Sequence, residues 1–170
     1  MVVGGDSAGG NLTLSVISVI LHSFESITPL KLDSSLAGIL LISPWISYST
    51  DGRSWKENED KDAIPAVCAV VLADAYVDAK DRNNYSEALT ADASWWKGIP
   101  AKKILNVYGG YECFRDHIAE LGDKIKQAGN PIVNVECPSQ VHIDLILDLH
   151  CGMETGVMTT TVLDWLSSVW

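Results

Sequence analysis

The chain has 170 residues and a formal net charge of −10, and 47% of its residues are hydrophobic against 20% that are charged. This composition is typical of a soluble globular protein and excludes an intrinsically disordered chain. The acidic balance argues against nucleic acid or an anionic membrane surface as a partner, because binding to phosphate groups depends on Lys and Arg.

Short apolar runs alternate along the chain with longer segments of helical periodicity. The first run leads directly into glycines, and a later one, Leu36 to Ser43, is continuously apolar and ends at Pro44. Such a run is typical of a strand that is buried on both faces. The first helix is expected to place Leu12, Val16, Val19 and Ile20 on one side. The predicted strands are 1–5, 36–43, 103–109 and 132–136, and the predicted helices are 11–22, 66–77, 115–128 and 159–170.

Strands separated by helices predict an α/β protein with a mostly parallel, open sheet and flanking helices. We expect one domain over residues 1–170. Residues 47–100 form a long inserted stretch of helix and loop, which is too long for a plain crossover between two strands. The predicted helix 66–77 inside this stretch is expected to belong to the core rather than to a partner surface.

The segment Gly5-Asp6-Ser7-Ala8-Gly9 fits the pattern G-x-S-x-G between a predicted strand and a predicted helix. In that context the tight turn strains the serine and lifts its hydroxyl above the sheet edge, which predicts a nucleophile elbow. The backbone N–H of Ala8, at the helix N-terminus, is the candidate oxyanion donor. A phosphate loop starting at Gly4 is disfavoured, because Gly10 and Asn11 occupy its Lys and Ser/Thr positions. A purely structural glycine turn remains the alternative.

A serine hydroxyl needs a base that takes its proton, and the candidates are the four histidines. His142 follows the last predicted strand, at the carboxyl edge where open α/β sheets bind ligands. It is therefore the predicted base, with His150 in reserve. His22 and His117 are interpreted as a residue at a helix end and a residue on a solvated helix face.

The acid that orients the base is expected in the loop after the third predicted strand. Glu112 and Asp116 are the two candidates there. Asp116 falls in the first turn of the following helix, where the helix dipole stabilises an acid whatever its function. We therefore favour Glu112 and keep Asp116 as the reserve acid.

Four features together resemble the hormone-sensitive-lipase-type branch of the α/β-hydrolases, which includes the steryl acetyl hydrolase-like esterases. They are "GDSAGGN", "LLISPW", "GGYECFRD" and the histidine after the last strand, and the resemblance runs from Met1 to about His150. It implies hydrolysis of carboxylic esters of small molecules, through an acyl-enzyme and without a cofactor. The family's usual acid loop is D-P-L-x-D. Here Glu112 takes the position of the first acid and Cys113 that of the proline.

Compared with this family, the chain lacks the H-G-G-type loop upstream of the elbow that supplies a second oxyanion donor. It resembles the C-terminal half to two-thirds of such a hydrolase, with the N-terminal part missing. The first strand would then leave an apolar sheet edge open, so we expect self-association, an N-terminal partner chain or aggregation. The alternative to an active esterase is an inactive hydrolase fragment or a binding module.

Other features are interpreted more briefly. Asp6 and the aromatic residues Trp45, Trp95 and Trp96 are candidates for the substrate pocket, and the tryptophans could equally cover the core. No metal is predicted: the acidic run "NEDKD" lacks the glycine and the closing glutamate of a calcium loop, so it is interpreted as a solvated acidic turn. The four cysteines form no CxxC pair and are expected to be free, although a disulfide stays possible. No membrane span or signal peptide is visible, which favours a cytoplasmic location.

Overall fold

The computed structural model describes residues 1–169, and its centre is a four-stranded parallel sheet in the order β1-β2-β3-β4. The strands are β1 (Val2–Asp6), β2 (Gly38–Ile42), β3 (Ile104–Gly109) and β4 (Ile132–Cys137). All three pairings are parallel, and Gly4 pairs with Leu40, Ile39 with Ile104, and Asn106 with Asn134. The predicted α/β class with a parallel sheet is confirmed.

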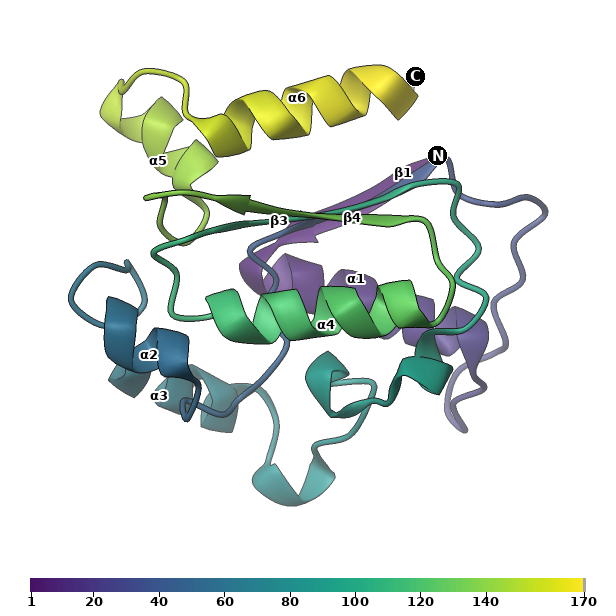
Figure 1. Cartoon of the computed structure of the whole chain (residues 1–170). Coiled ribbons are helices and arrows are strands. Elements are labelled where there is room, and N and C mark those ends of the chain that lie inside the picture. The colour runs from purple at the N-terminus through teal and green to yellow at the C-terminus, as the bar shows by residue number, and fades with distance from the viewer. Residues whose placement is uncertain (170) are drawn as a thin grey trace.

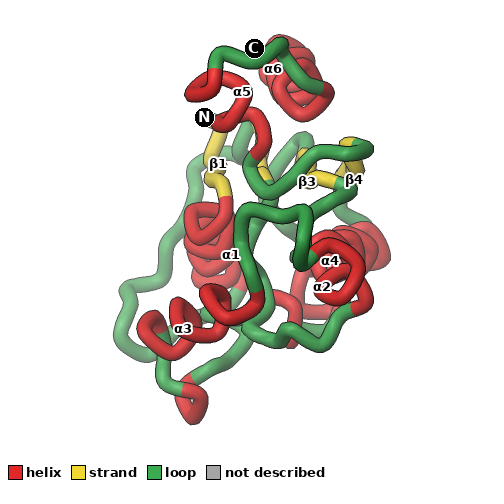
Figure 2. Tube along the Cα trace, turned by 90° about the vertical axis from the view of Figure 1, so that its left-hand side faces the viewer, coloured by secondary structure: helices red, strands yellow, loops and turns green. Residues whose placement is uncertain are grey.

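Helices cover both faces of this sheet (Figure 1). The helices α1 (Ser7–Leu21) and α4 (Arg115–Gln127) lie on one face, and α5 (Asp144–Cys151) and α6 (Val157–Val169) lie on the other. The turned view in Figure 2 shows the same two layers on either side of the strands. Neighbouring residues of β2 point to opposite faces of the sheet: Leu41 packs with residues of α1 and α4, and Leu40 packs with residues of α6. This two-sided cover explains why every residue of β2 and β3 is buried and why most of them, Asn106 in β3 excepted, are apolar or glycine.

The first helix begins earlier than its periodicity predicts and buries a different side. α1 starts at Ser7, and its buried apolar residues are Leu14 and Ile17. Leu12 and Val16, which the periodicity places together on one side of the helix, are 61% and 38% exposed. The helix is apolar on both sides, so its periodicity alone cannot select the side that meets the sheet.

The long segment between β2 and β3 contains α2 (Arg53–Asn58), α3 (Ala66–Tyr76) and three short 3-10 helices, at Ala79–Asp81, Ala88–Thr90 and Ala93–Trp96. The expectation that α3 belongs to the core holds for only one side of the helix. Only Ala69 and Ala73 of α3 are buried, while Val67 and Val71 are more than 60% exposed. The small alanine side chains let the helix backbone approach the cluster that contains Trp45, and the larger residues are left on the outside.

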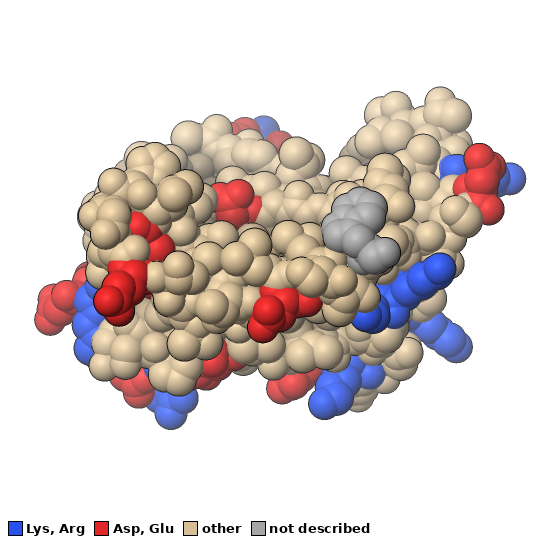
Figure 3. Space-filling model, turned by 90° about the horizontal axis from the view of Figure 1, so that it is seen from above, with Lys and Arg blue, Asp and Glu red and all other residues tan. Residues whose placement is uncertain are grey.

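Seen from the side of α5 and α6, the middle of the surface is largely uncharged, and most Lys, Arg, Asp and Glu side chains lie around its rim (Figure 3). Within residues 1–169, no helix combines the length and the apolar character that a membrane crossing requires. All four cysteines are free thiols, as expected.

Candidate active site

Ser7 lies at the sharp junction between β1 and α1. Its φ of 49° is in the left-handed region, which is rare for a residue other than glycine and costs on the order of 1–3 kcal/mol. The turn is tight because Gly5 and Gly9 come together: a Cβ on Gly5 would lie 2.4 Å from the carbonyl carbon of Gly9. Strand, strained serine and helix therefore follow one another as the elbow interpretation requires.

The imidazole of His142 lies beside this serine. His142 is in the loop between β4 and α5, and its Nε2 is 2.9 Å from Ser7 Oγ. Its Nδ1 is 3.3 Å from Oε2 of Glu112. His142 is 1% exposed, and the ring of Phe114 meets its imidazole edge to face, with ring centroids 5.1 Å apart. The structure thus brings Ser7, His142 and Glu112 into one line of hydrogen-bond contacts.

Glu112 is fully buried in the loop between β3 and α4. Its Oε1 accepts hydrogen bonds from the Ser43 hydroxyl and from the backbone N–H of Gly109. Burial raises the pKa of Glu112 above its usual range, and the hydrogen bond with His142 opposes this rise. The carboxyl group therefore depends on its hydrogen-bond partners to remain charged in the interior.

The reserve acid lies elsewhere. Asp116 accepts a hydrogen bond from the backbone N–H of Ser54 at 3.0 Å and pairs with Arg115 at 2.9 Å. Burial works against ionisation of Asp116, but the hydrogen bonds from Arg115 and Ser54 outweigh it and hold the pKa below its usual range. Asp116 thus joins a surface ion-pair network, and within residues 1–169 it makes no hydrogen bond or ion pair with His142.

Among the residues that the structure describes, none of the other three histidines forms a hydrogen bond with Ser7. His150 is exposed on α5, where Nδ1 is 3.1 Å from the carbonyl oxygen of Ile146. His22 stacks on Trp95 with ring centroids 3.7 Å apart. His117 lies on α4, and burial lowers its pKa.

The candidate oxyanion donor Ala8 is exposed in the first turn of α1. Backbone N–H groups in a first helical turn have no acceptor within their own helix, so this N–H is free to point at a ligand. Asp6 precedes the serine in extended conformation, and its side chain makes no capping hydrogen bond to α1.

The three candidate tryptophans separate into two groups. Trp45 lies near the elbow, because its backbone N–H donates to the backbone carbonyl oxygen of Ser7 at 2.9 Å. Trp96 is fully buried in the core cluster with Leu14 and Ile17, and Trp95 packs at the far end of α1 against His22. Since α1 has 15 residues and a helix rises about 1.5 Å per residue, that end lies roughly 20 Å from Ser7. Trp96 therefore belongs to the core and the partly buried Trp95 packs against it, while Trp45, although near the elbow, is also buried in a core cluster.

Two residues at the site were missed by the sequence analysis. Ser43, with φ of 45°, follows β2, and its Oγ contacts Glu112 and accepts the N–H of Ile143 at 3.1 Å. Asp62 accepts the backbone N–H groups of Cys113 and His142. The only signal for Ser43 was its place at the carboxyl end of a buried strand, beside the other strand ends. Asp62 was assigned to a solvated turn, but it is half-buried and faces inward.

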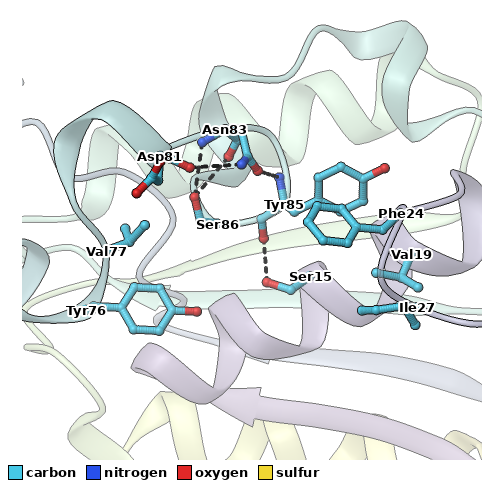
Figure 4. Close-up of a pocket in the computed structure, with 10 residues that line it drawn as sticks. All are labelled: Ser15, Val19, Phe24, Ile27, Tyr76, Val77, Asp81, Asn83, Tyr85 and Ser86. Carbon is cyan, nitrogen blue, oxygen red and sulfur yellow. Dashed lines mark hydrogen bonds between the residues drawn. The ribbon is translucent and has the colours of Figure 1, made fainter.

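A surface hollow of about 280 Å³ lies along α1 beyond the elbow (Figure 4). Its walls are aromatic and aliphatic and are formed by Phe24, Ile27, Tyr76 and Tyr85. Ser15 lines it on the side of α1. Ser15 is eight residues after Ser7, so it lies roughly 12 Å along the helix. None of the three residues Ser7, Glu112 and His142 lines this hollow. Within residues 1–169, no group of three or more His, Cys, Asp or Glu side chains is arranged to hold a metal ion.

The family assignment agrees with this geometry. Residues 1–145 match the family described as having the alpha/beta hydrolase fold, and the chain belongs to that family. No curated protein matches the sequence.

Several solved esterases share the fold. A thermostable esterase from Pseudomonas putida ECU1011 is similar with a TM-score of 0.70 and 27% identity, over 84% of this chain and 42% of its own. An esterase of the bacterial hormone-sensitive lipase family is similar with a TM-score of 0.68 and 26% identity, over 85% of this chain and 45% of its own. A hormone-sensitive lipase from a metagenome library has a TM-score of 0.78 over 99% of this chain and 54% of its own. At 21% identity, this similarity shows the fold alone. This chain therefore spans less than half the length of the first two esterases.

Proposed function

We propose that this chain is a serine carboxylester hydrolase that acts on small-molecule esters. The observation that carries the proposal is the line of contacts from Ser7 Oγ through His142 to Glu112, next to the free N-terminal turn of α1. Nucleophile and base are within hydrogen-bond reach, and a third group orients the base, which is the arrangement that activates a serine.

In the proposed reaction, Ser7 Oγ attacks the ester carbonyl while His142 Nε2 takes the hydroxyl proton. The backbone N–H of Ala8 stabilises the oxyanion that forms. Collapse of this intermediate expels the alcohol, which receives the proton from His142, and leaves an acyl group on Ser7. Water, deprotonated by His142, then attacks the acyl-enzyme. The acyl–Oγ bond breaks, the acid is released, and His142 returns the proton to Ser7 Oγ. Glu112 holds the imidazole with Nδ1–H toward itself and stabilises the imidazolium.

The alternative function is that of an inactive hydrolase fragment or a binding module. Two observations support it. The chain spans less than half the length of two of the solved esterases, and Ala8 is the one oxyanion donor that we can assign. Loss of a single oxyanion donor typically lowers the rate by about 10²–10³-fold.

We further propose that residues 1–170 form one α/β-hydrolase domain in which 47–100 is an inserted stretch.

β1 pairs only with β2, so its other edge is open within the described sheet. The exposed side chains of Leu12, Val16, Ile27 and Leu30 line an apolar groove along α1. We propose that a second copy or an N-terminal partner chain covers the open edge. Sedimentation of the dilute chain tests this: a stable monomer would contradict it.

The function is tested by hydrolysis of p-nitrophenyl acetate by the chain and by Ser7→Ala. Ser94→Ala is the matched control, because Ser94 is an exposed serine on the last 3-10 helix of the insert. We expect activity in the parent chain and in the control, and none above background in Ser7→Ala. Equal rates in all three proteins would favour the inactive alternative.

A further inference from the structure

The carboxylate of Asp62 binds three backbone N–H groups. Oδ1 accepts from Ala63 at 2.8 Å and from His142 at 2.9 Å, and Oδ2 accepts from Cys113 at 2.7 Å. Asp62 lies in the turn after α2, within the inserted stretch, 51 residues before Cys113 and 80 before His142. One side chain of the insert thus joins two loops that follow different strands of the sheet.

Both loops carry residues of the proposed reaction. Cys113 directly follows Glu112, and His142 is the proposed base. The hydrogen bond between Glu112 and His142 is 3.3 Å long, so the separation of their two backbones decides whether it forms. Asp62 fixes this separation from the side of the insert, because its two oxygens are bound one to each loop.

The end of α2 strengthens the same attachment. Asn58 Nδ2 donates to the carbonyl oxygen of Glu112 at 2.9 Å and to that of Gly110 at 3.3 Å. Asn58 and Asp62 are themselves joined, because the backbone N–H of Asp62 donates to the carbonyl oxygen of Asn58 at 2.9 Å. The acid loop is therefore held through both its N–H and its C=O groups by one short segment, 58–62.

We propose that Asp62 is a positioning residue for the proposed triad, and that it couples the inserted stretch to the alignment of Glu112 with His142. The proposal rests on the proposed function for its role in catalysis. A charged acceptor suits this position, because hydrogen bonds in which the acceptor is ionised are shorter and stronger than neutral ones. Asparagine would offer one acceptor oxygen where aspartate offers two. Its oxygen can accept the N–H of one loop, but its NH2 group would face and repel the N–H of the other loop.

The experiment compares Asp62→Ala and Asp62→Asn with Asp60→Ala. Asp60 is an exposed acid two residues earlier in the same turn, and its side chain makes no hydrogen bond to any of the described residues. Three quantities are measured in each protein: the exchange rates of the Cys113 and His142 amide hydrogens, the nuclear Overhauser effect between the Phe114 and His142 rings, and the rate at which a fluorophosphonate labels Ser7.

For Asp62→Ala we expect about tenfold to a hundredfold faster exchange at both amides, which corresponds to the loss of hydrogen bonds to a charged acceptor. The ring contact should weaken, and labelling of Ser7 should slow by about a hundredfold, as a displacement near 1 Å can cause. Asp62→Asn should keep one amide protected and restore part of the labelling rate. Asp60→Ala should match the parent in all three measurements.

Unchanged ring contact and labelling in a folded Asp62→Ala would overturn the proposal, even if the amides exchange faster. If Asp62→Ala does not fold, the ring contact and the labelling rate of Asp62→Asn are compared with the parent instead, and parental values in both would overturn the proposal. If Ser7 of the parent chain is not labelled at all, the proposed function fails. The role of Asp62 is then still decided by whether the Phe114–His142 contact is lost in the variants and kept in Asp60→Ala.

Discussion

Ser43 and Glu112 are joined by a hydrogen bond from the serine hydroxyl to Oε1 of the buried carboxylate. The same hydroxyl oxygen accepts the backbone N–H of Ile143, which directly follows His142. Ser43 therefore connects the acid and the base from the side of the sheet, as Asp62 does from the side of the insert. Each loop is held at two points, and this limits how far Glu112 and His142 can drift apart.

Replacing Ser43 by alanine is expected to lower both stability and activity. The change leaves the half-buried N–H of Ile143 without its acceptor and removes one donor from the fully buried Glu112, and an unsatisfied buried group costs about 1–3 kcal/mol. Denaturant unfolding and ester hydrolysis measure the two effects. Ser47→Ala is the control, because Ser47 is also buried but its hydroxyl bonds to Glu87. Equal losses of activity in the two variants would contradict a specific role of Ser43.

Replacing Glu112 by glutamine is expected to abolish hydrolysis while relieving the cost of a buried charge. A glutamine amide would donate to His142 Nδ1 and so favour the imidazole tautomer that cannot accept the Ser7 proton, a change that can cost about 10⁴-fold in rate. Glu112→Asp restores the charge on a shorter side chain and should recover part of the rate. A glutamine variant with parental activity would remove Glu112 from the mechanism.

The same variant has a pH signature. Because the pKa of Glu112 is raised by burial, ionisation of this group is less favourable in the folded than in the unfolded protein. The parent chain therefore loses stability from this group as the pH rises from its unfolded pKa of about 4.3 toward the folded value. Relative to the parent, Glu112→Gln should gain stability over that interval. Denaturant unfolding at a series of pH values measures the difference, and a constant difference would contradict the pKa shift.

Asp116→Asn should separate the reserve acid from the proposed one. The pKa of Asp116 is lowered in the folded protein, so its contribution to stability is present above its unfolded pKa of about 3.9 and is lost as the pH falls through the folded value. We expect a loss of about 1 kcal/mol at pH 7 that disappears in strong acid. Ester hydrolysis should be unchanged, and its loss would make Asp116 the acid.

The strands and the three main site residues could be predicted because local patterns fix them. Continuous apolar runs identify strands covered on both faces, and the carboxyl ends of parallel strands meet at one edge. Ser7, Glu112 and His142 were placed together by that rule. Their contacts in the structure agree with it, and their catalytic roles stay predictions.

Ser43 and Asp62 could not be predicted, because each acts through single hydrogen bonds to distant backbone groups that leave no periodic pattern. The outward side of α1 and the exposure of α3 were missed for another reason. Both helices are apolar on more than one side, so the side that packs depends on which elements cover it. The positions of Trp95 and Trp96 likewise depend on how the insert folds back along α1.

The two glycines that flank Ser7 are expected to respond differently to alanine. A Cβ on Gly5 would lie 2.4 Å from both the carbonyl carbon and oxygen of Gly9, and these backbone atoms cannot move without opening the turn. A Cβ on Gly9 would meet nothing within 4 Å, and alanine favours a helix over glycine by about 1 kcal/mol. Gly5→Ala should therefore unfold or strongly destabilise the chain, whereas Gly9→Ala should be as stable as the parent or more so. Thermal unfolding of the two variants side by side measures this contrast. Equal destabilisation by both would mean that the turn is held in some way other than by the close approach of Gly5 to Gly9.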